Sequence, residues 1–209
     1  MFATAEVRWF EEGEIPDHVL DWFAQVHPMS QPEPVRVDHY LRLRDTDGLG
    51  IKFREGRIEV KQRYGRASVA TLVPNAAGPV ERWRKWGFDL AEPAEDREII
   101  QGTEAWVAVR KERQVGHYGV GRDGAVERLP PLPFQVSGCS VELTRVTTPH
   151  RPLRGRIWWT LGFEATGKES ELVDTLTVVA RHVLRSLRGI ELSAKTSYGY
   201  PRWLQLVVG

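Results

Sequence analysis

Alternation of apolar and polar side chains is the main structural signal along this chain. Successive side chains of a β-strand point to opposite faces of a sheet, so a strand with one buried face alternates with a period of two. Seven segments alternate in this way and are predicted to be strands: residues 5–10, 39–44, 50–54, 57–63, 106–113, 139–145 and 157–165. Gly48 and Gly56 separate successive early strands, as hairpin turns require.

Two segments have helical periodicity instead. Residues 16–26 begin with a proline, which suits the first turn of a helix, and place their apolar side chains on one face. Residues 168–188 carry a broad apolar stripe. Thr166 and Glu169 have the spacing of a capping box, and Gly189 is a suitable terminator. The pattern therefore predicts an α+β protein in which strands dominate.

The polar faces of the predicted strands are charged along most of their length. Cations dominate the early strands, at Arg42, Arg44, Lys52, Arg54, Lys61 and Arg63. Carboxylates occupy corresponding faces of other strands, at Glu6, Glu59, Glu142 and Glu164. One interpretation is an open antiparallel sheet with one solvated face. Like charges directly opposite each other destabilise a sheet, however, and a closed sheet would place both sets of charges around one cavity.

We therefore predict a closed or nearly closed antiparallel β-barrel of about eight strands, a charged tunnel with flanking helices. Residues 1–209 are expected to form a single domain, since large β domains reach about 200–250 residues. Arginine and lysine side chains in such a tunnel would hold a chain of phosphates. Carboxylates would hold Mg²⁺ or Mn²⁺, which polarises phosphate oxygens while water attacks.

Several segments, in chain order, resemble the CYTH superfamily, the triphosphate tunnel metalloenzymes. The opening Glu6-Val-Arg8-Trp-Phe10 is similar to the family's Glu-x-Glu-x-Lys strand, and Tyr40-Leu-Arg42-Leu-Arg44 to its Leu-Arg-x-Arg strand. Ile58-Glu59-Val60-Lys61 resembles the strand with a substrate lysine, and the closing Lys195-Thr-Ser-Tyr198 its Lys-x-x-Tyr segment. Val141-Glu142-Leu143 and Phe163-Glu164-Ala165 lie where later acidic strands belong.

The resemblance implies an eight-stranded tunnel that hydrolyses triphosphate compounds with Mg²⁺ or Mn²⁺, on inorganic triphosphate, thiamine triphosphate or a nucleoside triphosphate. It implies phosphate contacts from Arg42, Arg44, Lys52, Arg54, Lys61, Arg110 and Lys195, to which the charge pattern adds Arg63. It assigns the metal to Glu6, Glu59, Glu142 and Glu164, and catalysis to Glu142 and Glu164. The sequence departs from the family pattern at Arg8, Phe10 and Gly162, where a glutamate, a lysine and a second acid are expected. Arg8 would add a phosphate contact and remove a metal ligand.

Composition excludes several other classes of protein. The net charge of +1 excludes a uniformly basic nucleic-acid coat, and there is no apolar run of about 18 residues that would predict a membrane span. The first residues lack the pattern of a signal peptide. The single cysteine, Cys139, excludes a disulfide framework and a cysteine-cluster zinc site. A cytoplasmic location is therefore expected.

Two alternatives to a hydrolase stay open. The first is a non-catalytic polyphosphate- or nucleotide-binding module on the same fold, suggested by Arg8 and Phe10. The second is a β-rich interaction protein that binds single-stranded nucleic acid or a protein through the aromatic and basic residues 80–86, although packed tryptophans explain that segment better. The closing segment from Trp203 is expected either to dock on the barrel or to form a homodimer contact.

Overall fold

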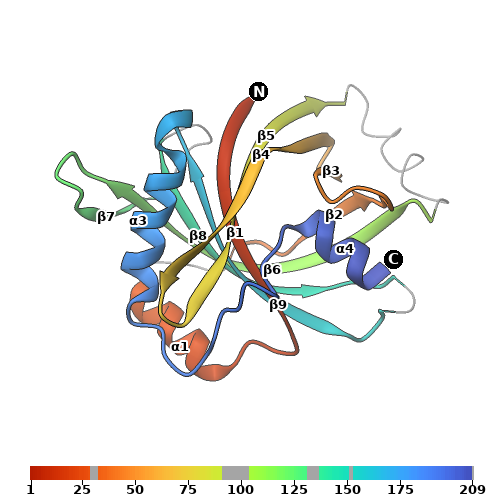
Figure 1. Cartoon of the computed structure of the whole chain (residues 1–209). Helices are drawn as coiled ribbons and strands as arrows, with labels where there is room; N and C mark the ends of the chain where they lie inside the picture. Colours follow the sequence, from red (N-terminus) through yellow and green to blue (C-terminus); the bar gives the residue numbers. More distant parts are fainter. Residues whose placement is uncertain (29–32, 91–103, 131–136, 151–152, 209) are drawn as a thin grey trace.

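The computed structural model describes residues 1–28, 33–90, 104–130, 137–150 and 153–208. Its strands form one antiparallel sheet with the order β2-β3-β4-β5-β1-β9-β8-β6-β7, and pairing of β2 with β6 closes the first eight into a barrel, with β7 added to β6. Figure 1 shows this arrangement. The strands are β1 (Phe2–Glu12), β2 (Arg36–Leu41), β3 (Leu49–Arg54), β4 (Arg57–Val73), β5 (Ala76–Asp89), β6 (Trp106–Val120), β7 (Val126–Leu129), β8 (Gly138–Thr147) and β9 (Ile157–Thr166).

The predicted closed barrel is therefore confirmed, and the open sheet is wrong. Each of the seven predicted strands has a counterpart, although the one predicted at 39–44 ends at Leu41. The sequence did not predict β5, which pairs with β4 along most of its length. In the middle of β5, charged and aromatic side chains occupy both faces, so this part of the strand lacks the alternation that marks the others.

In the described part of the chain, three α-helices cover or fill the barrel: α1 (Asp17–Val26), α3 (Leu172–Leu184) and α4 (Tyr200–Val208). Helices α1 and α3 lie on one side of the barrel (Figure 1), where they pack against outward-facing residues such as Val7, Phe163 and Val141. The helix predicted at 168–188 is shorter, because a 3₁₀ turn (Glu169–Glu171) precedes α3. The predicted capping box does not form, since no side chain caps either element.

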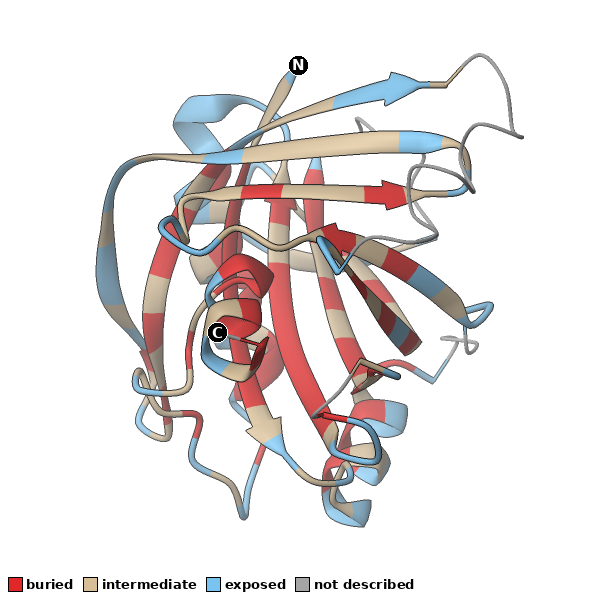
Figure 2. Cartoon of the chain, turned by 90° about the vertical axis from the view of Figure 1, so that its right-hand side faces the viewer, coloured by how far each residue is buried: buried red, intermediate tan, exposed pale blue. Residues whose placement is uncertain are grey.

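The interior of the barrel has two different halves. Helix α4 enters one end, where Trp203 stacks on Phe10 with ring centroids 5.5 Å apart and meets Trp158 edge-on. Figure 2 shows the buried residues of α4 against those of the surrounding strands. The closing segment thus docks within its own barrel. The other half is lined by ionised side chains, as the alternation predicted.

Candidate functional site

A cavity of about 590 Å³ occupies the charged half of the barrel, and eight strands contribute to its wall. Its cations point inward from β1 to β6, and they are Arg8, Arg36, Lys52, Arg54, Arg57, Lys61, Lys85, Lys111 and Arg113. Its carboxylates are Glu6, Glu59, Glu142 and Glu164, and Asp38 lies buried beside Lys111. Asp89 pairs with Arg57 and Glu33 pairs with Arg113, so the nine cations face seven carboxylates in all, and the cavity has a surplus of two positive charges.

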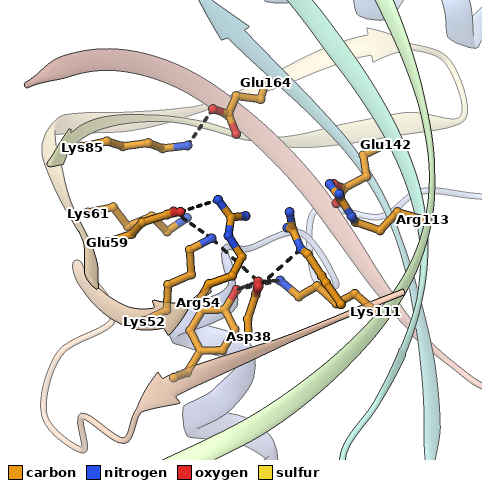
Figure 3. Close-up of polar contacts among 12 residues, drawn as sticks. Asp38, Lys52, Arg54, Glu59, Lys61, Lys85, Lys111, Arg113, Glu142 and Glu164 are labelled. Atoms are coloured by element: carbon orange, nitrogen blue, oxygen red, sulfur yellow. Dashed lines mark hydrogen bonds and ion pairs between the residues drawn. The ribbon is translucent and has the colours of Figure 1, made fainter. Parts of the chain in front are cut away.

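The first group of ion pairs joins β1, β4, β5 and β9. The carboxylate of Glu6 forms ion pairs with Lys61 Nζ at 3.1 Å and with Lys85 Nζ at 2.5 Å. Lys85 Nζ also lies 2.7 Å from a carboxylate oxygen of Glu164. Figure 3 shows Lys85 reaching toward Glu164 across the cavity. Burial alone would raise the pKa of Glu6, but the two ammonium groups outweigh it and hold that pKa far below its ordinary value. Glu6 is therefore ionised at neutral pH.

The second group centres on Glu142, which lies between two guanidinium groups. Arg8 Nη1 donates to Glu142 Oε1 at 2.9 Å, and Arg113 Nη1 donates to Oε2 at 3.1 Å. Burial opposes ionisation of this carboxyl, yet Arg8 and Arg113 more than offset it, so the pKa of Glu142 is well below its ordinary value. Both oxygens of Glu142 are thus bound by cations of the protein.

The third group lies at the bottom of the cavity, beside the aromatic residues. Lys111 Nζ donates to Asp38 at 2.8 Å and to the hydroxyl of Tyr40 at 2.7 Å, and it lies 3.6 Å from the centroid of the Tyr200 ring. Burial would raise the pKa of Asp38, but Lys111 and then Lys52 dominate and lower it. The lysine is therefore held by one carboxylate and two aromatic rings.

Glu59 completes the set from the neighbouring hairpin of β3 and β4. Its two oxygens lie 2.9 Å from Lys52 Nζ and 2.5 Å from Arg54 Nη2 (Figure 3). Lys52 and Arg54 lower the pKa of Glu59 although burial acts in the opposite direction. Every carboxylate of the cavity is therefore paired with at least one cation.

The structure brings together eight of the predicted site residues: Glu6, Arg8, Lys52, Arg54, Glu59, Lys61, Glu142 and Glu164. Five others do not line this cavity. Arg42 donates to the backbone carbonyl of Val208, and Arg42 and Arg44 line a separate pocket of about 200 Å³ beside α4. They fall outside because β2 ends at Leu41, before either residue.

The other three residues lie outside the cavity in different surroundings. Arg63 forms ion pairs with Glu81 at 2.6 Å and with Asp47 at 2.5 Å. Arg110 lies on the exposed outer face of β6, where it pairs with Glu112. Lys195 lies exposed in the segment before α4.

Sequence reasoning missed several cations that the structure places in the cavity: Arg36, Arg57, Lys85, Lys111 and Arg113. Lys111 and Arg113 share the inward face of β6 with Val107 and Val109, which are fully buried. The signal in the sequence was the alternation of these two valines with Ala108 and Arg110, which places Lys111 on the valine face and Arg110 on the opposite one. Lys85 was missed because β5 was not recognised as a strand.

Trp83, the centre of the nucleic-acid alternative, is fully buried in the structure. Its ring lies 4.2 Å from Lys61 Nζ, on the inner side of β5. A base cannot stack on a ring that solvent does not reach, so Trp83 is not a stacking platform.

The predicted metal does not fit the carboxylates in their present arrangement. Among the described residues, no three His, Cys, Asp or Glu side chains converge as ligands for one ion. Glu142 and Glu59 each use both oxygens for Arg or Lys, and Glu6 does the same with two lysines. Mg²⁺ and Mn²⁺ need several oxygens that converge on one point.

Comparisons with known proteins assign this chain to no family. No protein-family model matches the sequence, and no curated protein matches it. Among solved structures, the chain is similar to a conserved hypothetical protein from Pyrococcus furiosus, at 10% identity and a TM-score of 0.47, over 95% of this chain and 98% of that one. In the part of the chain that the structure describes, no helix has the length and apolar character needed to cross a membrane.

Proposed function

We propose that this protein is a non-catalytic binding module for a short linear polyanion of the triphosphate class. The observation that carries the proposal is the convergence of nine cations on one cavity, where the seven carboxylates that pair with them leave a surplus of positive charge. A bound anion would neutralise the surplus. The cavity volume of about 590 Å³ lies within the usual range of small-molecule sites, about 300–1,000 Å³.

The types of cation also favour phosphate. Arg8, Arg54 and Arg113 offer planar guanidinium forks, which match two phosphate oxygens at a time. Lys52, Lys61 and Lys85 offer compact charges from three neighbouring strands. Because these groups come from different sides of the barrel, a chain of linked phosphates would satisfy more of them than a single phosphate could.

Metal-dependent hydrolysis of the same substrates is the second candidate. It is favoured by the four predicted glutamates, which all lie in the cavity. It is the weaker candidate because those carboxylates are bound to arginine and lysine and do not converge. Its test is phosphate release from tripolyphosphate, thiamine triphosphate and ATP with added Mg²⁺ or Mn²⁺.

The test of binding is calorimetric titration with tripolyphosphate, with orthophosphate as the single-phosphate comparison. We expect binding of tripolyphosphate that weakens steeply with added salt, much weaker binding of orthophosphate, and no phosphate release. Lys61→Met should lower the affinity at least tenfold, whereas Arg110→Met removes the same charge outside the cavity and should not change it. Absence of tripolyphosphate binding at low salt would refute the proposal, and phosphate release would favour the hydrolase.

A further inference from the structure

The Arg8 side chain occupies a central position among the carboxylates of the cavity. It lies on β1, two residues after Glu6, and its side chain is only 12% exposed. Its Nη1 atom donates to Glu142 on β8 at 2.9 Å and to the hydroxyl of Thr160 on β9 at 2.8 Å. The guanidinium group of Arg8 thus connects β1 with side chains of β8 and β9.

Gly162 on β9 provides the space that Arg8 needs. Arg8 and Gly162 are directly paired across β1 and β9, and Gly162 is also paired with Glu142 on β8. A Cβ atom at position 162 would lie 2.6 Å from Cζ of Arg8 and 2.7 Å from its Nη2. No side chain can therefore be accommodated there while Arg8 keeps its position, so the arginine and the glycine form one structural unit.

Lys85 pairs with two other carboxylates of the cavity in the same manner. It contacts Glu6 at 2.5 Å and Glu164 at 2.7 Å, and so bridges two acids that do not otherwise meet. Arg8 and Lys85 together supply a positive charge to Glu142, Glu6 and Glu164, which are three of the four predicted metal ligands. Those three carboxylates have their positive partners without any added ion.

We propose that Arg8, accommodated by Gly162, stands in place of a divalent metal ion, so that the cavity binds its polyanion without metal. The inference rests on the proposed binding function and specifies its chemistry. The ligand would be the free polyanion and not its magnesium complex. Arg8 would offer its remaining N–H groups to the phosphates while Nη1 stays on Glu142 and Thr160.

The first experiment measures the wild-type protein after removal of metals. Tripolyphosphate is titrated in EDTA, in metal-free buffer and in excess Mg²⁺, and binding of Mn²⁺ to the protein alone is followed by electron paramagnetic resonance. We expect equal affinity, within about twofold, in EDTA and metal-free buffer, and no Mn²⁺ bound by the protein. Excess Mg²⁺ should weaken binding, because it competes for the polyanion in solution.

The outcomes separate the two claims. If tripolyphosphate binds only in the presence of Mg²⁺ or Mn²⁺, the proposal of metal-independent binding is overturned and the binding function stays intact. The same conclusion follows if the free wild-type protein binds Mn²⁺. Failure to bind tripolyphosphate under every condition would instead refute the binding function itself. Neither result depends on any variant being folded.

The second experiment changes the cation itself. Arg8→Glu would place a third carboxylate beside Glu6 and Glu142, and we expect this variant to bind Mn²⁺. Arg110→Glu introduces the same charge change on the outer face of β6 and should not. Circular dichroism establishes that both are folded. If Arg8→Glu does not fold, Arg8→Met takes its place, and it should bind tripolyphosphate at least tenfold more weakly in EDTA. A folded Arg8→Glu that binds no Mn²⁺, or an Arg8→Met of unchanged affinity, would overturn the role of Arg8.

Discussion

Lys85 Nζ lies 2.7 Å from Oε1 of Glu164, although the strands that carry them, β5 and β9, are not paired with each other. Both strands flank β1, and Lys85 reaches across it to contact Glu6 as well. One ammonium group therefore connects three neighbouring strands on the inside of the barrel. The charge that we assign to anion binding also contributes to the cohesion of the fold.

Lys85→Met should lower the free energy of unfolding by about 1–3 kcal/mol at pH 7, because it leaves two largely buried carboxylates with fewer partners. Urea denaturation measures the change. Arg156→Met is the matched control, since Arg156 pairs with Glu12 on the exposed surface and such pairs contribute little. The double variant Lys85→Met, Glu164→Gln should recover part of the loss. An unchanged midpoint for Lys85→Met would contradict the assignment.

Gly162→Ala should displace the Arg8 guanidinium, because the added Cβ would lie 2.6 Å from Cζ of Arg8. We expect tripolyphosphate affinity to fall severalfold while the protein remains folded, as measured by calorimetry and circular dichroism. Gly48→Ala is the control, since a Cβ there meets no atom closer than 3.7 Å. Equal affinities of the two variants would show that the position of Arg8 does not matter for binding.

His27 should make the protein sensitive to mild acid. Its side chain lies at the end of α1, is only 4% exposed, and contacts the hydroxyl of Tyr118 at 3.2 Å. Burial, with smaller contributions from Arg128 and His117, lowers the pKa of His27 to about 4. The folded state therefore binds a proton less readily than the unfolded chain, and stability is lost as the pH falls from about 6.5 to about 4.

The expected loss over that interval reaches about 3 kcal/mol, since each pKa unit corresponds to about 1.4 kcal/mol. His27→Asn should have a flatter stability profile between pH 6.5 and 4.5, measured by urea denaturation at each pH. His150→Asn, in the loop before the last strand of the barrel, should keep the wild-type profile. Parallel profiles for wild type and His27→Asn would rule out His27 as the source.

Trp203→Ala should destabilise the protein by about 3–5 kcal/mol, as expected for removal of a large buried aromatic side chain. Trp203 is 1% exposed and contacts Phe10, Trp158 and Tyr200 inside the barrel. Thermal unfolding measures the effect, and Arg202→Ala, one residue earlier on the exposed side of α4, should change stability by less than about 0.5 kcal/mol. Similar Tm values for both variants would mean that α4 does not stabilise the barrel.

Alternation predicted the strands and most of the charged lining, because a strand sends every second side chain to the same face, and the repulsion expected between like charges on an open face predicted the closed barrel. Glu6 and Arg8 on β1 and Glu59 and Lys61 on β4 were predicted in this way, and all line the cavity. The error at Arg110 was a shift of one residue, since Lys111 is the inward neighbour. Such a shift exchanges the two faces of a strand completely.

Other features depend on contacts that no local pattern contains. The position of the Arg42 side chain depends on its hydrogen bond to the carbonyl of Val208, which lies 166 residues later in the chain. The pairing of each carboxylate with arginine or lysine depends on which strands become neighbours across the barrel. The sequence could therefore predict many of the charges that face inward, but not which of them pair with each other.

Lys111 and Asp38 belong to β6 and β2, the two strands whose pairing closes the barrel. Their contact lies almost entirely out of solvent, beside Tyr40 and Tyr200. A ligand that drew Lys111 away would leave the buried carboxylate of Asp38 without this partner where β2 meets β6, which is energetically unfavourable. The ion pair that helps to close the barrel therefore limits how far a ligand can enter the cavity. A bound anion would contact the cations closer to the opening instead of Lys111.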